Sequence, residues 1–146
     1  MGTEQSIDTL NQFLRGEIAA VDTYKQALRR LEDHDASDNL HECLASHERR
    51  VQTLRRQVLE LGGTPSMTSG AWGTFAALFE GNVAALGDAA AITALEEGED
   101  RGLQLYLEDA CKLDRATRKL VEREILPEQL RTHDFLSDLK LTFSDG

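Results

Sequence analysis

Hydrophobic residues recur every three or four positions along four stretches of the chain, which is the spacing of amphipathic helices. The first three stretches cover residues 7–31, 40–61 and 92–113. The fourth begins near Asp114, and Pro127 should break or kink it, because proline lacks a backbone N–H and clashes with the preceding turn. The pattern therefore predicts four long helices.

The connections between these stretches predict how the helices are ordered in space. A polar run at residues 33–37 reads as a tight loop, so the first two helices should be antiparallel neighbours. Residues 64–70 form a second loop, and residues 72–86 have the pattern of a shorter helix. A connection of that length can return along the bundle, so the third long helix should run parallel to the second. We expect one all-α domain over residues 1–146, a four-helix bundle with a crossover helix between its second and third long helices.

Composition narrows the class of protein. The chain has 146 residues and a formal net charge of -10 at pH 7, which argues against binding to nucleic acid or to an anionic membrane surface. No apolar run is long enough to span a membrane, and the first residues lack the pattern of a signal peptide. We therefore expect a cytoplasmic protein.

Four ionisable residues interrupt the apolar stripes near the middle of the predicted helices. They are Glu17, His47, Glu99 and His133, one on each helix. A carboxylate inside an apolar stripe loses its hydration, which costs several kcal/mol unless it is paired or bound to a cation. Facing Glu and His side chains in a bundle core commonly form a metal site. The spacing thus predicts an internal site with two Glu and two His ligands.

The sequence also repeats itself weakly. Tyr24 follows Glu17 by seven residues, and Tyr106 follows Glu99 by the same interval. Each half therefore reads as a helical hairpin with Glu and Tyr on its first helix and His on its second. Two such hairpins packed with pseudo-two-fold symmetry would bring the four ligands together. The two tyrosines would then donate hydrogen bonds to the carboxylates of the opposite half.

A metal-free interpretation stands beside this one. Each His would hydrogen-bond the facing Glu, which gives buried polar pairs that need no metal ion. Arg50 bears on the choice because it is close in helical phase to His47. If Arg50 points inward, it neutralises Glu17 or Glu99, which favours the metal-free interpretation.

Taken together, these motifs resemble a bacterial ferritin-like four-helix-bundle family of uncharacterised function, within the ferritin-like superfamily. The resemblance covers nearly the whole chain. It rests on Leu14-Arg15-Gly16-Glu17 with Tyr24, His47-Glu48 before Leu61-Gly62-Gly63, Trp72-Gly73, Glu97-Gly98-Glu99-Asp100 with Tyr106, and Leu126-Pro127 with His133-Asp134.

The chain departs from the di-iron members of that superfamily, which carry Glu-x-x-His on the second and fourth helices. One register places His47 and Arg50 at those positions, with His133 and Leu136 on the fourth helix. The other register places Leu44 and Leu130 where the bridging carboxylates belong. Both motifs are missing in either register, so ferroxidase activity is not expected. Two Glu and two His would suit one metal ion, iron or zinc.

These observations leave two functional hypotheses. The first is a ferritin-like metal-binding protein; if it turns over a substrate, the resemblance implies redox chemistry at iron with oxygen or peroxide. The second is a metal-free interaction module that forms a homodimer or binds another partner through Trp72, Phe75 and Phe79 on the crossover helix.

Overall fold

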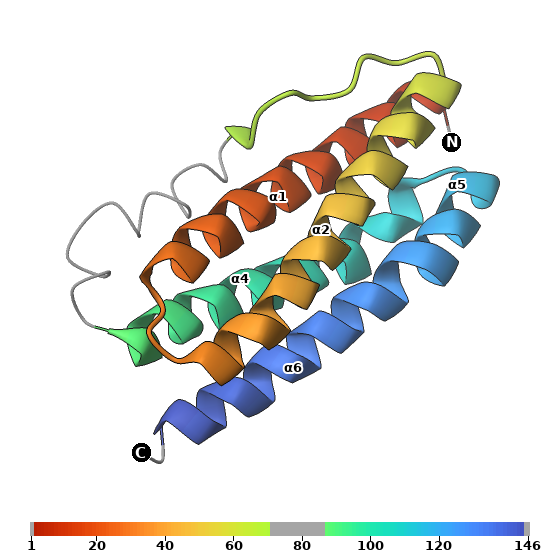
Figure 1. The fold of residues 1–146 in the computed structure, drawn as a ribbon. Coiled ribbons are helices and arrows are strands. Elements are labelled where there is room, and N and C mark those ends of the chain that lie inside the picture. Colours follow the sequence, from red (N-terminus) through yellow and green to blue (C-terminus); the bar gives the residue numbers. More distant parts are fainter. Residues whose placement is uncertain (1, 71–86, 145–146) are drawn as a thin grey trace.

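The computed structural model describes residues 2–70 and 87–144, which form an all-α four-helix bundle, as predicted (Figure 1). Three consecutive segments make up the fourth helix. The elements, in chain order, are α1 (Thr3–Arg30), α2 (His34–Glu60), α4 (Asp88–Asp109), the 3-10 turn η4 (Ala110–Lys112), α5 (Arg115–Leu120), the π-helical η5 (Val121–Ile125) and α6 (Leu126–Ser144). The crossover helix expected at residues 72–86, with Trp72, Phe75 and Phe79, lies outside the described residues.

Hydrogen bonds between helix ends fix the direction of α4. The backbone N–H groups of Glu32 and Asp33, just after α1, donate to the carboxylate of Asp88 at 3.1 and 3.0 Å. At the opposite end of the bundle, the N–H of Asp114 donates to the hydroxyl of Ser6 at 2.8 Å. The helix α4 therefore begins where α1 ends, and runs antiparallel to α1 and parallel to α2, as the long connection predicts.

The ends of α2 follow local capping chemistry. The Asp33 carboxylate accepts a hydrogen bond from the N–H of Ala36, so the helix already begins at His34 and not after residue 37. At the other end, Gly62 adopts a φ of +85°, and the N–H of Gly63 donates to the carbonyl of Val58. This is a Schellman-type ending, which glycine favours because it lacks a Cβ.

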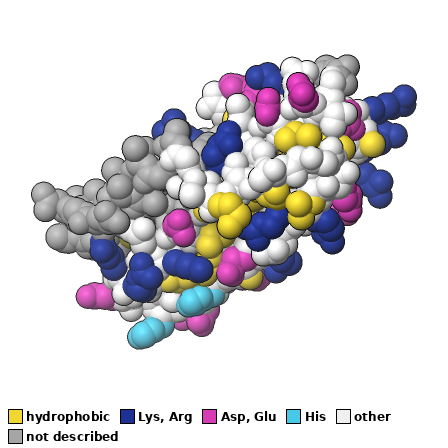
Figure 2. All heavy atoms as spheres, turned by 90° about the horizontal axis from the view of Figure 1, so that it is seen from above, with side chains coloured by type: hydrophobic (Ala, Val, Ile, Leu, Met, Phe, Trp, Pro, Cys, Tyr) yellow, Lys and Arg dark blue, Asp and Glu magenta, His cyan; other side chains and the backbone are white. Residues whose placement is uncertain are grey.

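Among the described residues, the core consists of two apolar clusters. One cluster, around Tyr24, Ile92 and Leu136, lies toward the α1–α2 loop, and the other, around Phe13 and Tyr106, lies toward the chain's N-terminal end. Outside the core, Figure 2 shows a face where side chains of both charges alternate with small hydrophobic areas. None of the described helices is long and apolar enough to cross a membrane.

The sequence predicts a break or kink of the fourth helix at Pro127, and the structure shows no break there. The π-helical segment Val121–Ile125 ends two residues before Pro127, and α6 continues through the proline to Ser144. A π turn takes more residues than an α turn, so side chains four positions apart stay on one face there. Buried Val121, Ile125 and Gln129 follow this spacing. The proline thus coincides with a widened turn and not with a break in the helix.

Candidate functional site

Three of the four predicted ligands meet between the two apolar clusters. Glu17 on α1, His47 on α2 and Glu99 on α4 are each no more than 3% exposed. The His47 imidazole lies between the carboxylates, with Nδ1 2.5 Å from Glu17 Oε1 and Nε2 2.7 Å from Glu99 Oε2. One side chain therefore links two helices through its two ring nitrogens.

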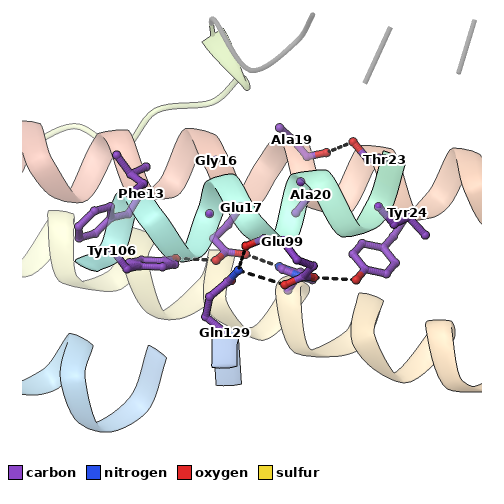
Figure 3. A pocket seen from close by; sticks show the side chains of 15 residues that line it. Phe13, Gly16, Glu17, Ala19, Ala20, Thr23, Tyr24, Glu99, Tyr106 and Gln129 are labelled. Atoms are coloured by element: carbon purple, nitrogen blue, oxygen red, sulfur yellow. Dashed lines mark hydrogen bonds and ion pairs between the residues drawn. The ribbon is translucent and has the colours of Figure 1, made fainter. Parts of the chain in front are cut away.

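Two tyrosines also bind these carboxylates, one from each side of the Glu17–His47–Glu99 cluster (Figure 3). Tyr24 donates its hydroxyl hydrogen to Glu99 Oε2 at 2.6 Å, and Tyr106 donates to Glu17 Oε2 at 2.5 Å. Each tyrosine thus binds the glutamate of the other half of the chain. These reciprocal hydrogen bonds between the two halves agree with the pseudo-two-fold arrangement expected from the repeat.

Arg50 points into the core. Its side chain is 2% exposed, and Nη1 lies 3.4 Å from Glu17 Oε2. The same Nη1 donates to Gln129 Oε1 at 2.5 Å, and Nη2 donates to the hydroxyl of Thr132 at 2.9 Å. The inward orientation is the one that favours the metal-free interpretation.

His133 does not join the other three predicted ligands, which corrects the sequence-based expectation. Its Nε2 lies 2.5 Å from Asp100 Oδ1, on the outer side of the α4–α6 pair, and its side chain is 21% exposed. A second partner, Asp134, lies 3.4 Å from Nδ1. The reason is the rotation of α6 about its axis: Gln129 and Thr132 are buried, whereas Leu130 is 42% exposed.

Gln129 and Thr132 take the inward positions on α6, and the sequence analysis missed them. Gln129 Nε2 donates to Glu99 Oε1 at 3.0 Å and to the Glu99 carbonyl at 2.9 Å. The Thr132 hydroxyl donates to the same Oε1 at 2.8 Å. Glu99 therefore has α6 partners, just as Glu17 has partners on α2.

A constant spacing in the sequence marks these positions. His47 follows Glu17 by 30 residues, and Gln129 follows Glu99 by 30 residues. Arg50 and Thr132 each follow the same glutamates by 33 residues. The two inward residues on each of these helices are three positions apart, as His47-x-x-Arg50 and Gln129-x-x-Thr132. This is the internal spacing of the Glu-x-x-His motif of di-iron carboxylate bundles, with different residue types.

The electrostatics of the layer favour ionised carboxylates. Burial alone raises the pKa of Glu17, but the charges of Arg50 and His47 outweigh it and lower the pKa to about 2. Burial also raises the pKa of Glu99, and the neighbouring His47 reverses this and lowers it below the usual range. Both carboxylates are therefore negative at neutral pH.

The positive charges balance them. Burial lowers the pKa of His47, but Glu99 and Glu17 together raise it above its usual value. Because each ring nitrogen also faces an oxygen of an ionised carboxylate, His47 donates from both nitrogens as the imidazolium. Arg50 stays protonated, because the carboxylates raise its pKa despite burial. Burial is the main cause that raises the pKa of both tyrosines. The next cause is the charge of Glu99 for Tyr24 and of Glu17 for Tyr106, so both phenols remain hydrogen-bond donors. Two anions thus face two cations.

This donor set does not fit a metal ion as it is arranged. Within the described part of the chain, no three His, Cys, Asp or Glu side chains converge as ligands. Because each nitrogen of His47 faces a different carboxylate, the two glutamates and one nitrogen share no common point. No buried side-chain nitrogen or oxygen among the described residues lacks a hydrogen-bond partner. The polar groups satisfy one another without a further ligand.

Glu17, His47, Arg50 and Glu99, with the polar side chains that contact them, form one network, and the space beside it is small. A cavity of about 30 Å³ lies between α1 and α4, where Gly16, Ala20, Gly98 and Gly102 line it (Figure 3). That volume holds roughly one or two water molecules. A larger hollow of about 180 Å³ lies on the outer side of α1 and α2, away from the network residues. As lined by the described residues, this central cavity has room for water but is too small for an organic substrate.

Comparisons with known proteins identify a family. The family model described as "Domain of unknown function (DUF2383)" matches residues 5–112, which include Glu17, His47, Arg50 and Glu99. No curated protein matches the chain, and no solved structure does.

Proposed function

The chain belongs to the family described as Domain of unknown function (DUF2383), and we propose that it is a ferritin-like helical-bundle interaction module whose centre is closed by an internal salt-bridge network. In this proposal the protein binds partners through its surface and performs no redox chemistry at its core. The network consists of Glu17, His47, Arg50 and Glu99 together with the polar side chains that contact them.

The inward position of Arg50 carries the proposal. Its guanidinium lies against Glu17 and holds two α6 side chains. With His47 protonated, the two cations offset the two carboxylates, so the site needs no external cation. A buried charge set of this kind stabilises a fold only while all its members are present.

Metal binding is the second candidate function. It is supported by the contact of both Glu17 and Glu99 with the same imidazole, which keeps three potential ligands close together. A metal ion would require neutral His47 with one nitrogen turned away from its carboxylate. In that case Glu17, His47 and Glu99 would hold one iron or zinc ion, without His133.

Metal loading decides between the two candidates. We expect the purified protein, incubated anaerobically with excess Fe(II) or Zn(II) and then freed of unbound metal, to contain far less than one metal ion per chain by elemental analysis. Stoichiometric metal that disappears in Glu17→Gln and His47→Ala, but persists in His133→Ala, would overturn the proposal and establish the second candidate. His133 is the matched control because it is a histidine outside the network.

The partner surface is proposed from the sequence alone. Trp72, Phe75 and Phe79, which lie outside the described residues, are the aromatic residues proposed to mediate a homodimer. We expect Trp72→Ala and Phe79→Ala to lower the sedimentation coefficient toward that of a monomer while the helical circular dichroism stays unchanged. An unaltered sedimentation profile in both variants would count against this surface.

A further inference from the structure

The guanidinium of Arg50 lies in a set of oxygen atoms contributed by three helices. Nη1 contacts a carboxylate oxygen and an amide oxygen. Nη2 contacts two hydroxyls and a backbone carbonyl, and Nε contacts one of the same two hydroxyls. These oxygens are Glu17 Oε2 at 3.4 Å, Gln129 Oε1 at 2.5 Å, Ser46 Oγ at 2.9 Å, Glu128 O at 3.1 Å and Thr132 Oγ1 at 2.9 Å. We call these five atoms the oxygen cage.

The chemistry of the oxygen cage is that of a hard cation site. Carboxylate, amide, hydroxyl and backbone carbonyl oxygens are the ligands that Ca²⁺, Mg²⁺ and Mn²⁺ prefer. No nitrogen or sulfur ligand belongs to the cage, because both ring nitrogens of His47 are directed at carboxylates. The cage shares Glu17 with the iron or zinc site considered above, but its other ligands and its preferred ion differ.

The charge of Arg50 is needed where it lies. Without it, two buried carboxylates would face only the imidazolium of His47. A net negative charge would remain beside empty space lined with oxygens, and such a charge is costly in a low-dielectric interior. Two responses would relieve this cost: protonation of Glu17 or uptake of a cation from solution.

We propose that Arg50 is a tethered cation that occupies a hard-cation site, and that removal of its side chain allows the oxygen cage to bind a divalent cation. The inference rests on the proposed function, because it explains how the bundle keeps a cation at its centre without a metal supply. The covalent link makes the cation permanent, so the native protein is insensitive to metal availability.

Thermal unfolding of Arg50→Ala with and without millimolar Mg²⁺, Ca²⁺ or Mn²⁺ tests the proposal. We expect at least one of these ions to raise the unfolding temperature of the variant by several degrees, because a ligand that binds only the folded state stabilises it. The wild-type protein and Arg49→Ala should not respond. Arg49 is the matched control, since it is the preceding arginine and its side chain is 64% exposed.

A second variant locates the ion. Glu17→Gln combined with Arg50→Ala removes the only carboxylate of the cage, and we expect it to lose most of the stabilisation by the cation. If Arg50→Ala is unfolded without cations, helix formation on titration with the same ions replaces the unfolding temperature as the readout, and Arg50→Ser provides a second neutral variant. No response in either variant, or an equal response in Arg49→Ala or in the double variant, overturns the proposal.

The outcome is separable from that of the proposed function. Stoichiometric iron or zinc in the wild-type protein, held by Glu17 and His47, would overturn the metal-free centre whatever the variants do. A metal-free wild-type protein whose Arg50→Ala variant ignores divalent cations would overturn only the tethered-cation proposal.

Discussion

Replacement of His47 by Leu is expected to lower the free energy of unfolding by about 3–5 kcal/mol at pH 7, the cost of breaking a buried ion pair by removing one partner. His47 is the only cation in contact with Glu99 among the described residues, and it also pairs with Glu17. Leu has a similar volume, so the loss reflects uncompensated charge more than a cavity. Urea unfolding followed by circular dichroism measures the change.

His133→Leu is the matched control. His133 also pairs with a carboxylate, but that partner, Asp100, is 53% exposed, and exposed ion pairs contribute about 0–1 kcal/mol. We therefore expect a small effect from this variant, although both histidines stand in apolar stripes of the sequence and both were predicted as ligands. Equal destabilisation by both variants would contradict the placement of His47 at the centre of the network.

Stability is expected to fall by roughly 3 kcal/mol through Glu17 alone as the solution is acidified. The pKa of Glu17 is lowered from 4.5 to about 2 in the folded protein. A lowered pKa contributes stability that is present above the unfolded value and is lost as the pH falls through the folded value. The loss should therefore extend from about pH 4.5 down to about pH 2.

His47 gives the opposite dependence on pH, a loss of stability as the pH rises; we call this the alkaline limb of the stability–pH curve, and the loss in acid the acid limb. Since the folded protein raises the pKa of His47 above 6.5, this contribution is complete below pH 6.5 and is lost as the pH rises through the folded pKa. The network as a whole should stabilise the bundle most between about pH 4.5 and pH 6.5.

Urea unfolding at a series of pH values tests both limbs. Glu17→Gln should make the loss of stability in acid less steep, because glutamine does not titrate, and His47→Leu should do the same for the loss at higher pH. Glu48→Gln serves as the control, since Glu48 adjoins His47 in sequence but is exposed. An equally steep loss of stability in acid for Glu17→Gln and the wild-type protein would show that Glu17 does not contribute to it.

Much of the site was predictable because the relevant signals are local. The 3.6-residue period of α1, α2 and α4 fixes which side of each helix is apolar, and Glu17, His47 and Glu99 stand within those stripes. The seven-residue interval to Tyr24 and Tyr106 is equally local. What the pattern left open was the direction of Arg50, which lies close to the border of its stripe.

The fourth helix was predicted in the wrong phase. Successive residues of an α-helix point about 100° apart, so an error of one position moves a side chain from the core to the surface. The π turn at Val121–Ile125 shifts this phase just before Pro127. Leu130 and His133 fit a regular apolar stripe in the sequence, whereas in the structure Gln129 and Thr132 occupy the inward positions.

A signal for Gln129 was present in the sequence but was hidden by side-chain type. The interval of 30 residues after each glutamate leads to His47 in one half and to Gln129 in the other. A search for a second histidine leads instead to His133, four residues further on. The repeat preserves the position while the chemistry differs, so a comparison by residue type alone misses it.

The sequence by itself determined the four helices, their order and direction, and the burial of three ionisable residues, because helical periodicity and connection length act over short stretches of chain. Only the tertiary structure decided which cation faces which carboxylate. That choice depends on the rotation of α6 against α4 and on the inward reach of Arg50. Both are set by packing between segments far apart in sequence, where the buried charges must be neutralised together.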